Sequence, residues 1–294
     1  MPRDKQSSPI YISSESEPED PKIVSPALPT IRLPSVLPQN IAATAPCRNL
    51  DLSTGRDLYL SPEDIATFTE GKWFNDMAME FGLSQSLRRH QLSEASLPGL
   101  WILSTFFHSK FRKKGYPAVA RWTRHWDVFA QDLIVIPVHK AYHWIIVIVC
   151  NPGACLNPKD SNSGIALQAQ IVSMDSLGGD QHMARDSVQT WLRQVAEAEG
   201  KLPAMHWQPP ISRSVNVPQQ PNFHDCGPFS IHNLSRFLMH HQQIVSGSIV
   251  TGSQEWNRVW KPQLAVHMRA TLRQQIRLRS RSNTHFVSFG KTSV

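Results

Sequence analysis

Three side chains that can act together in nucleophilic catalysis stand at the ends of predicted elements. Cys226 lies where a Pro- and Asn-containing loop meets an apolar helix, His143 opens a hydrophobic strand, and Asp175 follows the next strand. A helix N-terminus and a neighbouring imidazolium both favour the reactive thiolate of a cysteine. His143 would then protonate a leaving amine, and Asp175 would hold the imidazole tautomer. This pattern predicts a Cys-His-Asp triad for acyl transfer.

Gln220 could complete this set, because it lies six residues before Cys226 in the incoming loop. Its amide and the backbone N–H of Cys226 could both donate to the oxyanion of a tetrahedral intermediate. Each residue alone also has an ordinary structural interpretation. A cysteine at the start of an apolar helix is commonly a small buried side chain, and an aspartate after a strand commonly forms a turn. Only the combination of residues favours catalysis.

The elements that must position these residues follow from apolar patterning. Apolar runs predict buried strands at 132–138, 143–150 and 169–174, and a short strand at 214–217. A helix begins at Ser61, with Pro62 in its first turn. Further helices are predicted at 77–82, 97–112, 186–198, 226–239 and 255–279, the last interrupted by Pro262. Helices, then a central mixed sheet, then helices are typical of an α+β domain.

The net charge of the chain is unevenly distributed. Its 294 residues include 30 Lys and Arg and 23 Asp and Glu, a formal charge of +7. Residues 258–294 hold eight basic and no acidic residues, so the remainder holds 22 basic and 23 acidic residues, a net of −1. The basicity is therefore assigned to the C-terminal end, as a solvated helix face. We expect no nucleic acid as the main substrate.

Composition also excludes several other classes of protein. No apolar run reaches eighteen residues, so no membrane span is predicted. The four cysteines are widely spaced and form no C-x-x-C pair, which argues against a disulfide framework and a zinc site. We expect neither a metal nor a cofactor.

Three regions are predicted along the chain. Residues 1–50 are rich in Pro and Ser and are predicted to form a disordered tail, 51–280 a catalytic domain, and 281–294 a basic, flexible tail. Within the first tail, Ile10, Tyr11 and Ile12 precede a Ser- and Glu-rich tract. Such a segment can add a strand to the sheet edge of a partner.

Four motifs resemble those of one enzyme family. Pro218–Gly227 (PQQPNFHDCG) closely resembles the nucleophile signature of the Ulp/SENP family, the cysteine proteases that process SUMO. His143-Trp144 is similar to the family's histidine motif, and Met174–Leu177 to its Asp-Ser-Leu motif. Trp73–Asp76 resembles its Trp-Leu-Asn-Asp motif, with Phe for Leu. The four occur in the family's order, and the resemblance covers about residues 55–280.

This resemblance implies a fold, a reaction and a substrate. The fold would be the papain-like α+β fold of the adenain/Ulp clan, a central mixed sheet flanked by helices. The reaction would be cleavage after the C-terminal Gly-Gly of SUMO or a related ubiquitin-like protein, by a monomer in the nucleus or cytoplasm. Trp73 and Trp144 would bound a narrow tunnel for the Gly-Gly strand, and Asp76 would contact the modifier surface. Ile10–Ile12 resembles a SUMO-interacting motif.

Several alternatives stay open at the level of sequence. Ser104–Lys110 and the Cys150–Gly153 loop look like the Ulp2-like branch, which implies trimming of SUMO chains. Pro228, where the family usually has an apolar residue, leaves open an inactive SUMO-binding pseudo-protease. A protease for another ubiquitin-like modifier and an acyltransferase of the same clan are further alternatives; Gln220 and the predicted tunnel argue against the acyltransferase.

Overall fold

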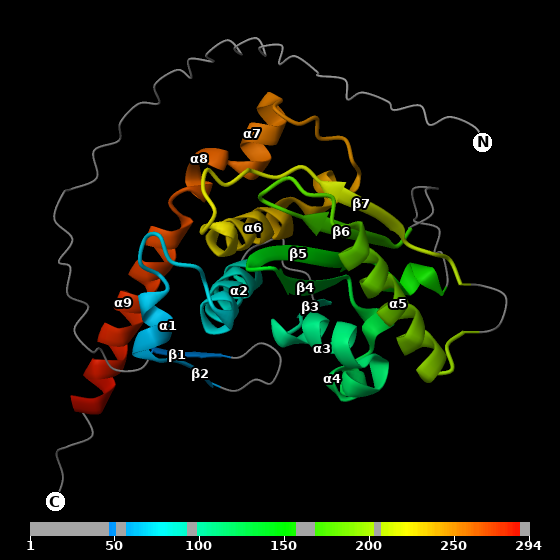
Figure 1. Ribbon diagram of the computed structural model, residues 1–294, viewed down its shortest axis with the longest axis horizontal. Coiled ribbons are helices and arrows are strands. Elements are labelled where there is room, and N and C mark those ends of the chain that lie inside the picture. The colour runs from blue at the N-terminus through cyan, green and yellow to red at the C-terminus, as the bar shows by residue number, and fades with distance from the viewer. Residues whose placement is uncertain (1–46, 51–56, 93–98, 157–167, 203–206, 289–294) are drawn as a thin grey trace, which may run out of the picture. The chain divides into compact units, whose positions relative to one another are not determined.

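The computed structural model describes residues 47–50, 57–92, 99–156, 168–202 and 207–288 (Figure 1). The chain divides into two units, residues 1–42 and 43–294, and every described residue belongs to the second. The segment Ile10–Ile12 lies outside the described residues.

A five-stranded mixed sheet forms the centre of the described unit (Figure 1). Its strand order is β3–β4–β5–β6–β7. The two outer pairs are parallel, and the two inner pairs are antiparallel. The strands are β3 (Leu100–Ile102), β4 (Leu133–Lys140), β5 (His143–Cys150), β6 (Gln170–Met174) and β7 (Ile211–Val215).

Helices cover both faces of this sheet. The α2 (Asp76–Gln91) and α6 (Cys226–Val245) helices pack on one face, and α3 (Phe106–Lys114) and α5 (His182–Ala198) on the other (Figure 1). The remaining helices are α1 (Pro62–Ala66), α4 (Ala120–Thr123), α7 (Gln254–Trp260), α8 (Pro262–Ala265) and α9 (Met268–Ser288), with 3₁₀ turns η1 (Tyr116–Ala118), η2 (Val128–Ala130) and η3 (Pro152–Cys155). The predicted fold class, a central mixed sheet flanked by helices, is confirmed.

The central strand β5 explains why the sheet is covered on both sides. Ile145, Val147 and Val149 point to the face of α3 and α5, where they pack with Phe107 and Trp191. The alternate residues of β5 are equally buried on the opposite face. A strand buried on both faces has a continuous apolar sequence, and this is the signal that predicted β5.

The predicted helix over 97–112 is wrong in its first half. Leu100–Ile102 pairs in parallel with the start of β4, and α3 begins only at Phe106. The carbonyl of Gly99 accepts hydrogen bonds from the backbone N–H groups of Asp132 and Leu133, at 2.7 and 3.0 Å. Three apolar residues fit either a helix or a strand, and here the open edge of β4 determines the outcome.

The folded unit extends beyond both predicted boundaries. Cys47–Leu50, expected in the N-terminal tail, forms β1 and pairs with β2 (Asp57–Leu60). The α9 helix continues to Ser288, eight residues into the expected C-terminal tail. In the part of the chain with described coordinates, no helix is both long and apolar enough to cross a membrane.

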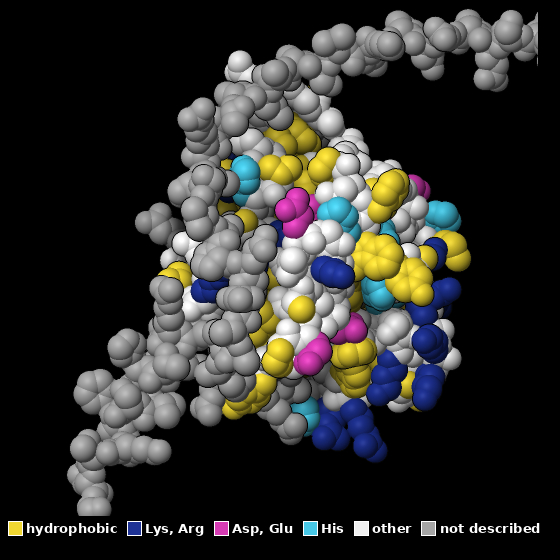
Figure 2. Space-filling view, turned by 60° about the vertical axis from the view of Figure 1, so that its left-hand side comes forward, with side chains coloured by type: hydrophobic (Ala, Val, Ile, Leu, Met, Phe, Trp, Pro, Cys, Tyr) yellow, Lys and Arg dark blue, Asp and Glu magenta, His cyan; other side chains and the backbone are white. Residues whose placement is uncertain are grey.

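The assignment of the basicity to the C-terminal end alone is wrong. Six exposed cations lie on or beside α3 and α4, and residues 99–126 contain no Asp or Glu. They are Lys110, Arg112, Lys113, Lys114, Arg121 and Arg124. Figure 2 shows Lys and Arg side chains close together along one edge of the face in view. A near-neutral total concealed this separation, because the acidic residues that balance it lie elsewhere in the chain.

Candidate active site

Cys226 is the first residue of α6, and only 1% of its surface is exposed. The helix that follows continues to a kink at His240, so the thiol lies at the positive end of a helix dipole. Pro228 lies in the first turn, where backbone N–H groups have no partner within the helix, so a proline is accommodated there. The departure from the family pattern therefore leaves the nucleophile helix intact.

His143 and Asp175 form the second part of the site. The imidazole Nε2 lies 2.6 Å from Asp175 Oδ1, which leaves Nδ1 as the ring nitrogen for the hydrogen bond to Cys226. Asp175 also accepts hydrogen bonds from the backbone N–H of Leu177, at 2.8 Å, and from Gln181 Nε2, at 2.6 Å. The structure thus brings together the three residues that the sequence predicted as a triad.

These contacts change the protonation of both partners. Burial by itself lowers the pKa of His143, but hydrogen bonds to Asp175 and Cys226 outweigh burial and raise its pKa to about 9. Burial by itself raises the pKa of Asp175, but hydrogen bonds from His143, the Leu177 backbone and Gln181 lower it below its usual value. An imidazolium beside an ionised carboxylate is therefore the stable state at neutral pH, and it is the state that favours a thiolate.

The β4–β5 hairpin determines where His143 lies. Lys140 pairs with His143, so Ala141 and Tyr142 form a two-residue turn in which both have positive φ, 49° and 61°. This is the turn geometry that matches the twist of a hairpin. The carbonyl oxygen of Tyr142 lies 4.0 Å from Cys226 Sγ, which places the turn directly beside the nucleophile.

Gln220 is held in a fixed orientation by Ser176, for which no catalytic role was predicted. Ser176 Oγ donates to Gln220 Oε1 at 2.6 Å, and Gln220 Nε2 donates to the carbonyl of Asn222 at 2.5 Å. The backbone N–H of Gln220 also donates to the carbonyl of Ser176, at 2.9 Å. Among the described residues, these contacts use one of the two side-chain N–H groups, so the other can serve an oxyanion.

Replacing Gln220 with alanine is expected to lower kcat by about 10²–10³-fold with little change in KM, because an oxyanion donor acts in the transition state. Steady-state hydrolysis of a ubiquitin-like substrate measures both constants. Gln208→Ala, at an exposed position away from the site, is the control. An unchanged kcat in Gln220→Ala would remove Gln220 from the oxyanion hole.

The two predicted tunnel tryptophans lie in different environments. Trp144 is 1% exposed, and its Nε1 donates to the carbonyl of Phe74 at 2.9 Å. Trp73 is 51% exposed; its Nε1 donates to the carbonyl of Phe223 at 2.7 Å, and its ring stacks on Tyr142 with centroids 5.6 Å apart. An exposed aromatic pair therefore borders the catalytic hairpin. Contact of either tryptophan with substrate stays a prediction.

Phe74 connects the entry motif to the nucleophile motif. A Cβ atom on Gly227 would lie 2.8 Å from Phe74 Cβ, so the start of α6 can approach this ring only with glycine next to Cys226. Asp76, in the same entry motif, is the first residue of α2, and Asn75 is the N-cap, with Oδ1 accepting from the Ala78 N–H at 3.0 Å. The predicted contact of Asp76 with a modifier is not tested by this geometry.

The other cysteines with described side chains have a different chemistry. Cys150 and Cys155 are fully buried in the core, and burial raises the pKa of each thiol to about 12. Such thiols are neutral at physiological pH and unreactive. Reactivity within the described core is therefore expected at Cys226.

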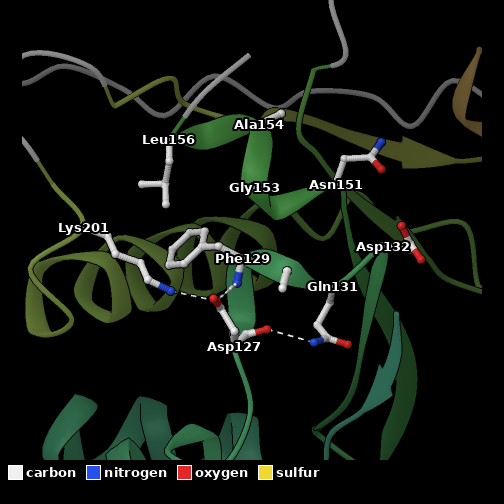
Figure 3. Close-up of a pocket in the computed structure, with 10 residues that line it drawn as sticks. Asp127, Phe129, Gln131, Asp132, Asn151, Gly153, Ala154, Leu156 and Lys201 are labelled. Atoms are coloured by element: carbon white, nitrogen blue, oxygen red, sulfur yellow. Dashed lines mark hydrogen bonds and ion pairs between the residues drawn. The ribbon is translucent and has the colours of Figure 1, made fainter. Parts of the chain in front are cut away.

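A cavity of about 500 Å³ lies away from these residues (Figure 3). It is lined by residues around the start of β4 and the end of β5, including Phe129, Asp132 and Gly153. His143 is at the opposite end of β5, seven residues away and thus about 24 Å along the strand. Lys201 points toward Asp127 there and pairs with it at 2.8 Å (Figure 3). This cavity is not part of the triad site.

Known proteins are similar to this chain in sequence and in fold. Human sentrin-specific protease 2 is 28% identical over 181 residues, which cover 61% of this chain and 28% of that protein. The chain thus matches less than a third of that relative's length. A crystal structure of a de-sumoylating protease shares the fold, with a TM-score of 0.72 and 20% identity over 83% of this chain and 95% of that one. The C-terminal Ulp1 protease domain in complex with Smt3, the yeast ortholog of SUMO, has a TM-score of 0.50 and 21% identity over 78% of this chain and 87% of that one.

The family assignment rests on a match longer than any single motif. The model of the Ulp1 protease family, C-terminal catalytic domain, matches residues 72–275. This range contains Trp73, His143, Asp175, Gln220 and Cys226, and it covers more than half of the chain. The chain therefore belongs to the Ulp1 protease family and contains its catalytic domain.

Proposed function

We propose that this protein is a thiol isopeptidase that cleaves after the C-terminal Gly-Gly of SUMO. The observation that carries the proposal is the hydrogen-bonded set of Cys226, His143 and Asp175 at the N-terminus of α6, within the matched family domain. Isopeptide bonds to lysine and peptide bonds of a precursor both present the same acyl group to the nucleophile. Deconjugation, chain trimming and maturation are therefore all within its chemistry.

The geometry supports a two-step acyl transfer. The Cys226 thiolate attacks the carbonyl carbon of the terminal glycine, and the resulting oxyanion accepts hydrogen bonds from the Gln220 amide and the Cys226 backbone N–H. His143 then gives its Nδ1 proton to the departing amine as the C–N bond breaks, leaving a thioester on Cys226. Water attacks the thioester and loses one proton to His143, and the C–S bond breaks to release the free thiolate and the carboxylic acid, which gives its remaining proton to solvent.

Specificity for Gly-Gly has a steric basis in this proposal. Trp73 and Tyr142 present flat, exposed rings beside the hairpin that ends next to Cys226. A flat aromatic surface close to an extended chain accepts glycine and excludes any residue with a Cβ. The motifs that resemble the Ulp2-like branch support SUMO chains as substrates, and Ile10–Ile12 would add a second SUMO contact. A nuclear or cytoplasmic location and a monomeric state complete the proposal.

The test is a panel of modifiers, each prepared as a Gly-Gly fluorogenic amide and as an electrophilic C-terminal probe. We expect rapid turnover of the SUMO amide and covalent capture of the SUMO probe at Cys226, read by mass spectrometry. Capture of a different modifier in preference to SUMO would assign the protease to that modifier. Binding of SUMO without covalent capture would contradict the proposed protease activity and would indicate a SUMO-binding module.

A further inference from the structure

Arg269 is the second residue of α9 and belongs to the C-terminal stretch that sequence reasoning assigned to solvent. Its side chain is 9% exposed, and it lies at the end of α9 that approaches the catalytic loop. The guanidinium packs over the Phe74 ring, 4.9 Å from the centroid. A buried cation in this position needs a complete set of acceptors.

Its hydrogen bonds account for all five N–H groups of the guanidinium. Nε donates to Asp225 Oδ1 at 2.7 Å. One terminal nitrogen donates to the carbonyls of Thr67 and Thr69, at 2.8 and 3.1 Å. The other donates to the carbonyls of Lys72 and His224, at 2.7 and 3.0 Å. A lysine, with three donors and no planar fork, cannot reproduce this set.

The acceptors belong to the two segments that carry the catalytic and substrate-facing residues. Lys72 immediately precedes Trp73, and Asp225 immediately precedes Cys226. One guanidinium therefore sets the spacing between the exposed indole of Trp73 and the nucleophile. The segment Thr67–Trp73, which we call the Trp73 loop, lies about 200 residues before Arg269 in the sequence.

Without Arg269, the carboxylate of Asp225 would disfavour a thiolate at the adjacent Cys226. It is the N-cap residue of α6, yet its side chain makes no capping hydrogen bond to the helix. It is turned away to Arg269 and to Asn222 Nδ2, at 2.7 Å. Without Arg269, the Asp225 carboxylate would keep, among the described side chains, only the Asn222 amide and His224 Nε2, which lies 4.0 Å away. Its negative charge next to Cys226 would then oppose ionisation of the thiol by like-charge repulsion.

We propose that Arg269 is a positioning residue for this active site, with two actions. It pairs with the negative charge of Asp225 beside the nucleophile. It also holds the Trp73 loop against the segment His224–Cys226, which leads into α6. This inference rests on the proposed function, but its first action concerns only the thiol. It can be measured without any ubiquitin-like substrate, so a failure here is distinguishable from a wrong substrate assignment.

The experiment compares Arg269→Gln, Arg269→Gln/Asp225→Asn and Arg269→Lys with the wild type. Arg258→Gln, an exposed arginine on α7, is the control and is expected to match the wild type. The readouts are the pH profile of Cys226 alkylation by iodoacetamide, kcat and KM for the SUMO amide, and the melting temperature.

Arg269→Gln is expected to move the alkylation profile about one unit to higher pH and to lower kcat/KM by about 10²-fold, since small misplacements of reacting groups have effects of that size. The double variant should regain the wild-type alkylation profile, because Asp225 no longer carries a charge. Arg269→Lys should keep that profile but raise KM, since the carbonyls of the Trp73 loop lose their donors.

A folded Arg269→Gln variant with a wild-type profile and kcat would overturn the proposal, and so would a double variant whose profile stays shifted. If Arg269→Gln does not fold, Arg269→Lys decides the matter: a wild-type KM would contradict the positioning of the Trp73 loop. A purely structural role would lower the melting temperature and leave the profile and both kinetic constants unchanged.

Discussion

Replacing Cys226 with serine is expected to lower kcat/KM by about 10⁴-fold or more, because loss of a nucleophile removes the covalent pathway. Serine keeps the size of the side chain, but its hydroxyl is not ionised near neutral pH by a helix dipole and an imidazolium. Steady-state hydrolysis of a SUMO amide measures the loss. Binding of intact SUMO, measured by calorimetry, is expected to be retained, since the exposed surface beside the site is unchanged.

Cys155→Ala is the matched control for this substitution. Cys155 is completely buried, and burial raises the pKa of its thiol to about 12, so it contributes packing and no nucleophile. The control is expected to lose some stability and keep the wild-type kcat. Turnover that survives in Cys226→Ser, or disappears in a folded Cys155→Ala, would assign the nucleophile to another residue.

Replacing Asp175 with asparagine is expected to lower kcat/KM near pH 7.5 by about 10²–10⁴-fold, because the imidazole loses its charged partner. The substitution also has a characteristic pH dependence. His143 must be protonated both to pair with the thiolate and to protonate the leaving amine. Because its pKa is raised to about 9, wild-type activity should persist through neutral pH and be lost as pH rises through about 9.

Asparagine removes two of the contributions that raise the pKa of His143, the charge of Asp175 and its hydrogen bond to the cation, while burial still lowers that pKa. The alkaline limit of kcat/KM is therefore expected to move down by about 1–3 units. A pH series from 5 to 10, with Asp186→Asn on the exposed side of α5 as control, measures the limit. An unchanged limit in Asp175→Asn would separate Asp175 from His143 in function.

The stability of the fold should also depend on pH through His143 and Asp175. The folded-state pKa of His143 lies above its ordinary value of 6.5, so the pair stabilises the fold fully below pH 6.5 and loses this contribution as pH rises through about 9. The folded-state pKa of Asp175 lies below its ordinary value of 3.8, so its contribution is present above pH 3.8 and is lost at lower pH. In Asp175→Asn, the unfolding free energy should therefore fall less steeply with rising pH above 6.5 and with falling pH below 3.8.

The triad was predictable because each member stands at the junction of an element with a strong local signal. The apolar run of β5 begins at His143, β6 ends one residue before Asp175, and α6 begins at Cys226. Short-range patterning determines such junctions, and strand pairing then brings them together: β5 and β6 are antiparallel neighbours. The capping box of α1, in which Ser61 and Asp64 exchange hydrogen bonds, is local in the same way.

Other features depended on contacts that no local pattern encodes. The edge strand β3 formed because β4 offered a free edge, although its three apolar residues fit a helix equally well. Ser176 orients Gln220, which lies 44 positions later in the sequence. Trp144 can be buried because its Nε1 donates to the carbonyl of Phe74, 70 positions earlier.

The sequence by itself predicted the chemistry that we propose for this protein: the nucleophile, its base, the residue that orients the base, and the elements that carry them. Only the tertiary structure decided how these groups are held. Arg269 shows the difference most clearly. Its charge predicted a position on a solvated helix face, whereas in the structure it is buried and donates five hydrogen bonds. The physical reason is that residue type and spacing set local conformation, whereas desolvation and hydrogen-bond satisfaction depend on which distant segments pack against each side chain.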